Sequence, residues 1–83
     1  MISATWLINT TKGPAAGSAD CDDVDAAWTA LTSAWKEAVG PSWGPDHEGP
    51  LRQLEAEART ALATADRWSH VATAVVITLT RTG

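Results

Sequence analysis

The chain opens with a stretch in which apolar and polar positions alternate. The apolar positions are every second residue, namely Ile2, Ala4, Trp6 and Ile8. A period of two places these side chains on one face of an extended strand, so we predict a half-buried strand over residues 2–10. Residues 12–19 contain two glycines, a proline and a serine, and we expect a loop there.

The next stretch repeats its apolar positions every three or four residues. The stripe consists of Val24, Ala27, Trp28, Leu31, Ala34, Trp35, Ala38 and Val39. This spacing predicts a helix with one apolar face over residues 22–39. Aspartates precede the stripe, and their carboxylates can accept the free amide hydrogens of a first helical turn. Gly40 and Pro41 are suited to end the helix.

Residues 40–50 carry three glycines and three prolines, and we expect this Gly/Pro loop to lack regular structure. Pro50 suits the first turn of a second helix, predicted over residues 50–68. Its apolar face would consist of Leu51, Leu54, Ala58, Ala61, Leu62, Ala65 and Trp68. Glu55 and Arg59 are spaced for an exposed ion pair on that helix. Alternation returns over residues 71–81 with β-branched side chains, which predicts a second strand.

The predicted elements give a single α+β domain, residues 1–83, with the order β-α-α-β. We expect the N- and C-terminal strands to pair antiparallel and the two helices to form a helical hairpin on one sheet face. A two-stranded sheet is marginal alone, and the apolar segment 75–80 would be an exposed edge. We therefore predict that homodimerisation pairs this edge with a second copy and extends the sheet to four strands.

Composition narrows the function classes. Ten acidic residues outnumber six basic ones, which gives a net charge of −4 and no basic patch, so we do not expect nucleic-acid binding. The longest apolar stretch is far shorter than a membrane span, and no cationic, apolar leader opens the chain. We expect a cytoplasmic protein that does not bind membranes. Cys21 is the only cysteine, so no internal disulfide can form.

Few residues suggest chemistry. Asp46, His47 and Glu48 offer acid–base groups within the Gly/Pro loop, but no nucleophile, zinc or phosphate motif accompanies them. The aspartates near Cys21 lack the glycine and ligand spacing of a calcium loop, and helix capping accounts for them. His70 is expected at a helix–strand junction. We predict no catalytic residue, no metal and no cofactor, and we interpret Cys21 as a structural residue.

Trp43 is the strongest candidate for a binding residue. Four other tryptophans fall on predicted core faces, whereas Trp43 lies in the loop, where it either plugs the end of the core or remains exposed. Exposed tryptophan is enriched in binding hot spots. We therefore predict a homodimeric protein without catalytic activity that contacts an unknown protein partner through Trp43, with Ser42, Asp46 and His47 nearby.

Two other interpretations of the function stay open. The chain could be an assembly subunit of a larger particle, which predicts oligomers above the dimer. It could also be a small-molecule binder or minor enzyme that uses Asp46, His47 and Glu48. The low lysine and high alanine content favours a GC-rich bacterial source. Within the main prediction of a protein-binding protein, a phage or mobile-element accessory protein that modulates a host protein would fit this size.

Overall fold

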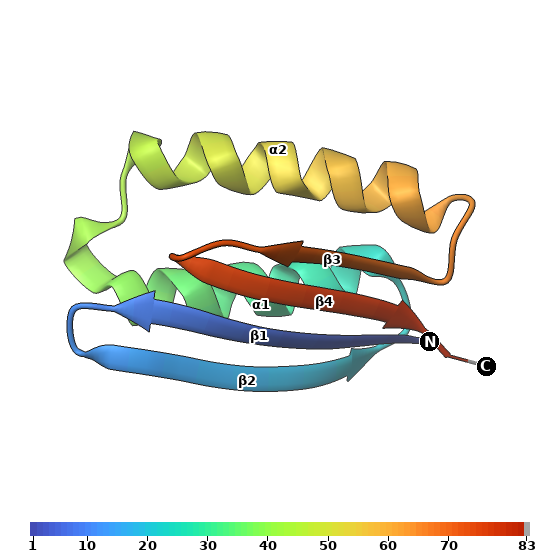
Figure 1. Cartoon of the computed structure of the whole chain (residues 1–83), viewed down its shortest axis with the longest axis horizontal. Helices are drawn as coiled ribbons and strands as arrows, with labels where there is room; N and C mark the ends of the chain where they lie inside the picture. Colours follow the sequence, from blue (N-terminus) through green and yellow to red (C-terminus); the bar gives the residue numbers. More distant parts are fainter. Residues whose placement is uncertain (83) are drawn as a thin grey trace.

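Four strands form one antiparallel sheet, and two helices cover one of its faces (Figure 1). This is the arrangement in a computed structural model that describes residues 1–82. In chain order the elements are β1 (Ile2–Thr10), β2 (Gly13–Cys21), α1 (Val24–Val39), a 3-10 turn η1 (Gly40–Ser42), α2 (Pro45–Leu62), β3 (Arg67–Val71) and β4 (Val75–Arg81). The strand order is β2-β1-β4-β3. The α+β class predicted from the sequence is confirmed.

The two central strands are β1 and β4, and they pair antiparallel from Ile2 opposite Arg81 to Ile8 opposite Val75. This confirms the predicted pairing of the N- and C-terminal strands. Their alternation also has the expected consequence, because every second residue enters the core. The buried positions of the two strands are Ile2, Ala4, Ile8, Val75, Ile77 and Leu79.

The helices supply the other half of the core. Their buried residues are Ala27, Trp28, Leu31 and Trp35 of α1, with Leu51, Leu54, Ala58 and Leu62 of α2. Helix α1 begins two residues later than predicted. The Asp23 carboxylate accepts a hydrogen bond from Ala26 N at 2.8 Å, which is the expected capping by an aspartate. Gly40 ends the helix with a positive φ of 69°.

The segment predicted as a loop over residues 12–19 is instead the edge strand β2. Its register places Gly17 directly opposite Trp6 of β1. The Trp6 indole covers Gly17 so closely that a Cβ on the glycine would stand 2.5 Å from Nε1. Pro14 is tolerated because β2 lies at the sheet edge, where a missing N–H need not break a ladder. The glycine and proline that predicted a loop therefore belong to a strand.

The second helix is also displaced from its predicted range of 50–68. It begins at Pro45, so much of the predicted Gly/Pro loop is helical and Pro50 lies inside the helix rather than at its start. It ends at Leu62, whose carbonyl accepts a hydrogen bond from Arg81 Nη2 at 2.6 Å. An arginine that bonds the last carbonyls stabilises a helix C-terminus.

The single strand predicted over residues 71–81 is a hairpin of β3 and β4. Trp68 belongs to β3 rather than to the second helix, and it faces the helices from the strand. Strand β4 is paired on both sides, so segment 75–80 is not the exposed edge that motivated the homodimer. All four strands come from one chain, and the homodimer stays a prediction that needs a different interface.

Candidate functional site

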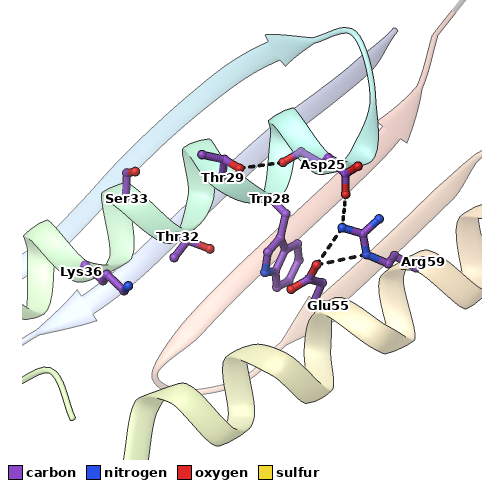
Figure 2. A pocket seen from close by; sticks show the side chains of 8 residues that line it. All are labelled: Asp25, Trp28, Thr29, Thr32, Ser33, Lys36, Glu55 and Arg59. Atoms are coloured by element: carbon purple, nitrogen blue, oxygen red, sulfur yellow. Dashed lines mark hydrogen bonds and ion pairs between the residues drawn. The ribbon is translucent and has the colours of Figure 1, made fainter. Parts of the chain in front are cut away.

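A groove of about 560 Å³ separates α1 from α2 on the helix-covered side of the molecule (Figure 2). Six of its lining residues come from α1 and two from α2. They are Asp25, Trp28, Thr29, Thr32, Ser33 and Lys36 from α1, with Glu55 and Arg59 from α2. The groove forms because both helices turn their apolar stripes toward the sheet, so their adjoining flanks carry polar side chains.

Trp28 is the deepest of these residues. Its side chain descends from α1 between the two helices (Figure 2) and is only 4% exposed. One side of the indole packs against Trp68 of β3, with ring centroids 6.1 Å apart. Nε1 is buried, and among the described residues it has no hydrogen-bond partner. An unsatisfied buried donor costs about 1–3 kcal/mol, a cost that a bound acceptor atom would remove.

An ion-pair cluster closes one end of the groove. The Arg59 guanidinium of α2 bonds Asp25 of α1 and also Glu55 Oε2, the latter with Nη2 at 2.7 Å and Nε at 3.0 Å. The hydrogen bonds that Arg59 donates to Glu55 and then to Asp25 raise the pKa of Arg59. The predicted pair of Glu55 and Arg59 is present, and Asp25 adds a link between the helices. The Arg59 charge is therefore already compensated.

Lys36 marks the other end of the groove. Its Nζ lies 3.7 Å from Glu48 Oε1 and 5.7 Å from the centre of the Trp43 ring. Trp43 Nε1 donates a hydrogen bond to the same carboxylate oxygen at 2.7 Å. This hydrogen bond is the main reason that the pKa of Glu48 is lowered, and the charges of Lys36 and Arg52 add to it. Trp43 thus lies next to the Lys36 end of the groove, although it does not line the groove itself.

Trp43 both packs against the end of the core and keeps part of its side chain exposed, the two alternatives considered from the sequence. It is half-buried and packs against the core through an edge contact with Trp35, with centroids 5.6 Å apart and planes at 81°. Its ring also stacks with His47 at 5.0 Å and 21°. Beside Trp43 lies a shallow surface depression, which Glu48 and Arg52 also line. The indole therefore joins the core edge to an accessible surface.

Of the other residues predicted for the site, only some lie close to Trp43. His47 Nδ1 accepts a hydrogen bond from Gly44 N at 3.3 Å, which holds the first turn of α2. Since the Glu48 carboxylate binds Trp43, two members of the Asp46, His47 and Glu48 trio serve the local structure. Ser42 and Asp46 are exposed, Ser42 in η1 and Asp46 in the first turn of α2.

Two further residues lie outside the groove. Cys21 is a free, half-buried thiol at the end of β2, packed against the core. His70 lies within β3 rather than at a helix–strand junction, and it stacks with Trp68 at 6.4 Å and 13°. Within residues 1–82, no three histidine, cysteine or acidic side chains are grouped so that they could hold a metal ion. In the same range, neither helix is long and apolar enough to cross a membrane.

The groove was missed from the sequence. Its hydroxyl-bearing wall consists of Thr29, Thr32 and Ser33, which flank the apolar stripe of α1 on one side. Such residues resemble any solvated helix face until the position of the second helix is known. The only available signal was that this flank carries three hydroxyl groups between Asp25 and Lys36.

Comparison with known proteins gave no match: no family model, no curated protein and no solved structure is similar to the chain. The arrangement of the groove is therefore the basis on which a function can be argued.

Proposed function

We propose that the chain is a small protein-binding protein without catalytic activity, which holds an extended, uncharged segment of its partner in the groove between α1 and α2. The observation that carries the proposal is the buried Trp28 Nε1, which has no acceptor within the described residues and belongs to a side chain that lines the groove. A backbone carbonyl of a bound segment would provide that acceptor once the indole turns its Nε1, which has almost no accessible surface, toward the groove. Trp43 would flank the segment at the Lys36 end, in keeping with the role expected for tryptophan at interfaces.

The charges around the groove favour a neutral ligand. Arg59 is paired with Asp25 and Glu55, and Lys36 is close to Glu48. An anionic ligand such as a phosphate would have to compete with these carboxylates. The net charge of −4 also repels nucleic acid. Peptide carbonyls and amides, in contrast, match the indole N–H and the three hydroxyl groups of the α1 wall.

A peptide selection with two matched variants tests the proposal. Thr29 and Thr60 are both exposed helical threonines, and each hydroxyl bonds the carbonyl four residues earlier at 2.9 Å. Thr29 lines the groove, whereas Thr60 lines a separate surface depression beside Trp68. Thr29→Arg and Thr60→Arg therefore make the same chemical change on and off the groove.

A random peptide library is selected on the wild-type protein, and dissociation constants are measured for the enriched sequences. We expect Thr60→Arg to bind them within about twofold of the wild type and Thr29→Arg to bind at least about tenfold more weakly, which corresponds to about 1.4 kcal/mol. Failure to enrich any peptide, or equal binding by the two variants, would contradict the proposed groove.

The Trp28 indole proton gives an independent readout. In a nitrogen–proton NMR spectrum the tryptophans give separate indole signals, and the signal absent from Trp28→Phe identifies that residue. We expect the Trp28 signal to move downfield when a selected peptide binds, because the proton gains a hydrogen bond. An unmoved Trp28 signal together with displaced signals of other tryptophans would place the binding surface elsewhere.

A further inference from the structure

The sheet face that points away from the helices carries rows of side chains fixed by the strand register. We call it the open face. Three rows cross all four strands in the order β2, β1, β4, β3. They are a charged row of Asp20, Ser3, Thr80 and Arg67, a hydroxyl row of Ser18, Thr5, Thr78 and Ser69, and an apolar row of Ala16, Leu7, Val76 and Val71.

The apolar row is exposed to an unusual degree. Val71 is 77% exposed and Leu7 is 38% exposed, and both are among the few large hydrophobic side chains on the surface of the described residues. They lie in one row, because Leu7 and Val71 are both opposite Val76 of β4. Adjoining exposed apolar residues on a flat sheet indicate an interaction surface.

The open face is complementary to itself. Asp20 is on edge strand β2 and Arg67 on the opposite edge strand β3, and they are the only charged residues in the three rows. Consider a two-fold axis that is parallel to the strands and lies between two such faces. It places edge strand β2 of one copy over edge strand β3 of the other, and each row over the same row of the second copy. Asp20 of one copy then lies opposite Arg67 of the other, twice, while hydroxyl meets hydroxyl and apolar meets apolar.

The alternative axis lacks this match. A two-fold axis perpendicular to the strands would keep the edges in place and lay the charged row over the apolar row, which would bury unpaired charges. We therefore propose that two copies of this chain associate face to face through their open faces, with the axis along the strands. Sheets packed in this aligned manner lie about 10 Å apart, with strands about 30° from parallel. The long Arg67 side chain of one copy can cross most of this distance to reach the short Asp20 side chain of the other.

The size of the face limits the area that the association can bury. Strands about 4.8 Å apart and residues about 3.4 Å apart make each face roughly 19 by 24 Å, or about 900 Å² in projection for two faces. This lies at the lower end of specific interfaces, so we expect a dimer with a dissociation constant in the micromolar range. The groove between α1 and α2 lies on the other side of the sheet, and this dimer would leave it accessible.

The test is the solution mass of the whole chain by sedimentation equilibrium from about 1 μM to 1 mM, with charge reversals at the two edges. We expect the mass to rise toward twice the 8.7 kDa of one chain. Arg67→Asp should weaken the dimer about tenfold or more, because it places Asp20 opposite a second carboxylate. The double variant Asp20→Arg, Arg67→Asp should restore the wild-type constant within about threefold.

The restoration is the decisive result. Two strands separate β2 from β3 within one chain, so the two side chains lie about 14 Å apart and cannot pair there. Only contact between copies can make the two reversals compensate. As a control for the apolar row, Leu7→Lys should abolish the dimer, whereas Ala63→Lys at the exposed end of α2 should not. A monomer at 1 mM, a dimer insensitive to Leu7→Lys, or a double variant no tighter than Arg67→Asp would each overturn the proposal.

Discussion

The indole of Trp6 lies across the backbone of Gly17, its direct partner on the neighbouring strand β2. A Cβ on Gly17 would stand 2.5 Å from Trp6 Nε1 and within 2.8 Å of two ring carbons. The large side chain thus covers the surface that the glycine leaves bare, a device by which an aromatic residue compensates for glycine in a strand. The pair therefore adds to the packing of the edge strand β2.

We predict that Gly17→Ala lowers the free energy of unfolding by about 1–3 kcal/mol, because the indole must leave its position to admit a methyl group. Urea denaturation followed by tryptophan fluorescence measures this loss. Gly49→Ala is the control, since nothing lies within 4 Å of its Cβ position and alanine favours the helix. The control should gain about 0.5–1 kcal/mol. Equal effects of the two substitutions would show that the Trp6 contact is unimportant.

Pro50→Ala should stabilise the protein. Pro50 lies inside α2, where proline lacks the N–H that would bond the carbonyl of Asp46 and its ring crowds that carbonyl. The gain should be about 1 kcal/mol or more, since proline costs about 3 kcal/mol in a helix interior but also restricts the unfolded chain. Thermal unfolding followed by circular dichroism checks this. The matched change Pro14→Ala on the edge strand should change stability by less, and a loss on Pro50→Ala would contradict the prediction.

Stability should fall in acid partly because of Glu48. Its pKa is lowered in the folded protein, mainly by the hydrogen bond from Trp43. Ionised Glu48 therefore stabilises the fold fully above the ordinary glutamate pKa of about 4.3, and this contribution is lost as the pH falls through the lower folded value. We expect Glu48→Gln to reduce the difference in urea midpoint between pH 6 and pH 3. Glu57→Gln, the same change on the exposed side of the same helix, is the matched control, and a Glu48→Gln effect no larger than that of the control would contradict the prediction.

Arg59 should couple the two helices weakly. The guanidinium bridges Asp25 and Glu55 on the surface, where ion pairs contribute at most about 1 kcal/mol. We predict a loss of about 0.5–1 kcal/mol for Arg59→Ala, smaller in high salt, and a double-mutant cycle with Asp25→Ala should give a favourable coupling energy. Lys12→Ala, in the exposed turn between β1 and β2, serves as a control with no expected loss. Strictly additive effects of Arg59→Ala and Asp25→Ala would refute the inter-helix bridge.

The sequence was sufficient to predict those elements in which large apolar side chains recur periodically. Strand β1 and helix α1 were predicted nearly within their observed bounds, because apolar residues at a period of two or of 3.6 must face a core. The same alternation predicted β4, but with a start four residues too early. Their antiparallel pairing followed from the order of the elements. The pattern of apolar residues alone was thus enough to predict the two central strands of the sheet and helix α1.

The edges of the sheet depended on contacts that the local sequence does not contain. The inward positions of β2 include Ala15, Gly17 and Ala19. These small residues predict a loop unless it is known that Trp6 covers the glycine. The position of Trp68 in the sequence fits both the apolar stripe of a helix and the alternation of a strand. In the structure Trp68 lies in strand β3 and contacts Trp28 from there. For the candidate site, Trp43 was predicted as a binding residue because it lies outside the periodic apolar patterns of the helices and strands. The groove was missed because it exists only once α1 and α2 are placed side by side.

The position of β1 and β4 at the centre of the sheet also determines when the protein can fold. The hairpins β1–β2 and β3–β4 are local, but the ladder that joins them links Ile2 to Arg81, across almost the whole chain. Closing so long a loop comes before most of the burial that rewards it, which slows folding. During synthesis the sheet cannot close until β4 has left the ribosome. Until then the apolar sides of β1 and α1 are not covered by the complete sheet, so the newly made chain is most open to aggregation just before β4 emerges.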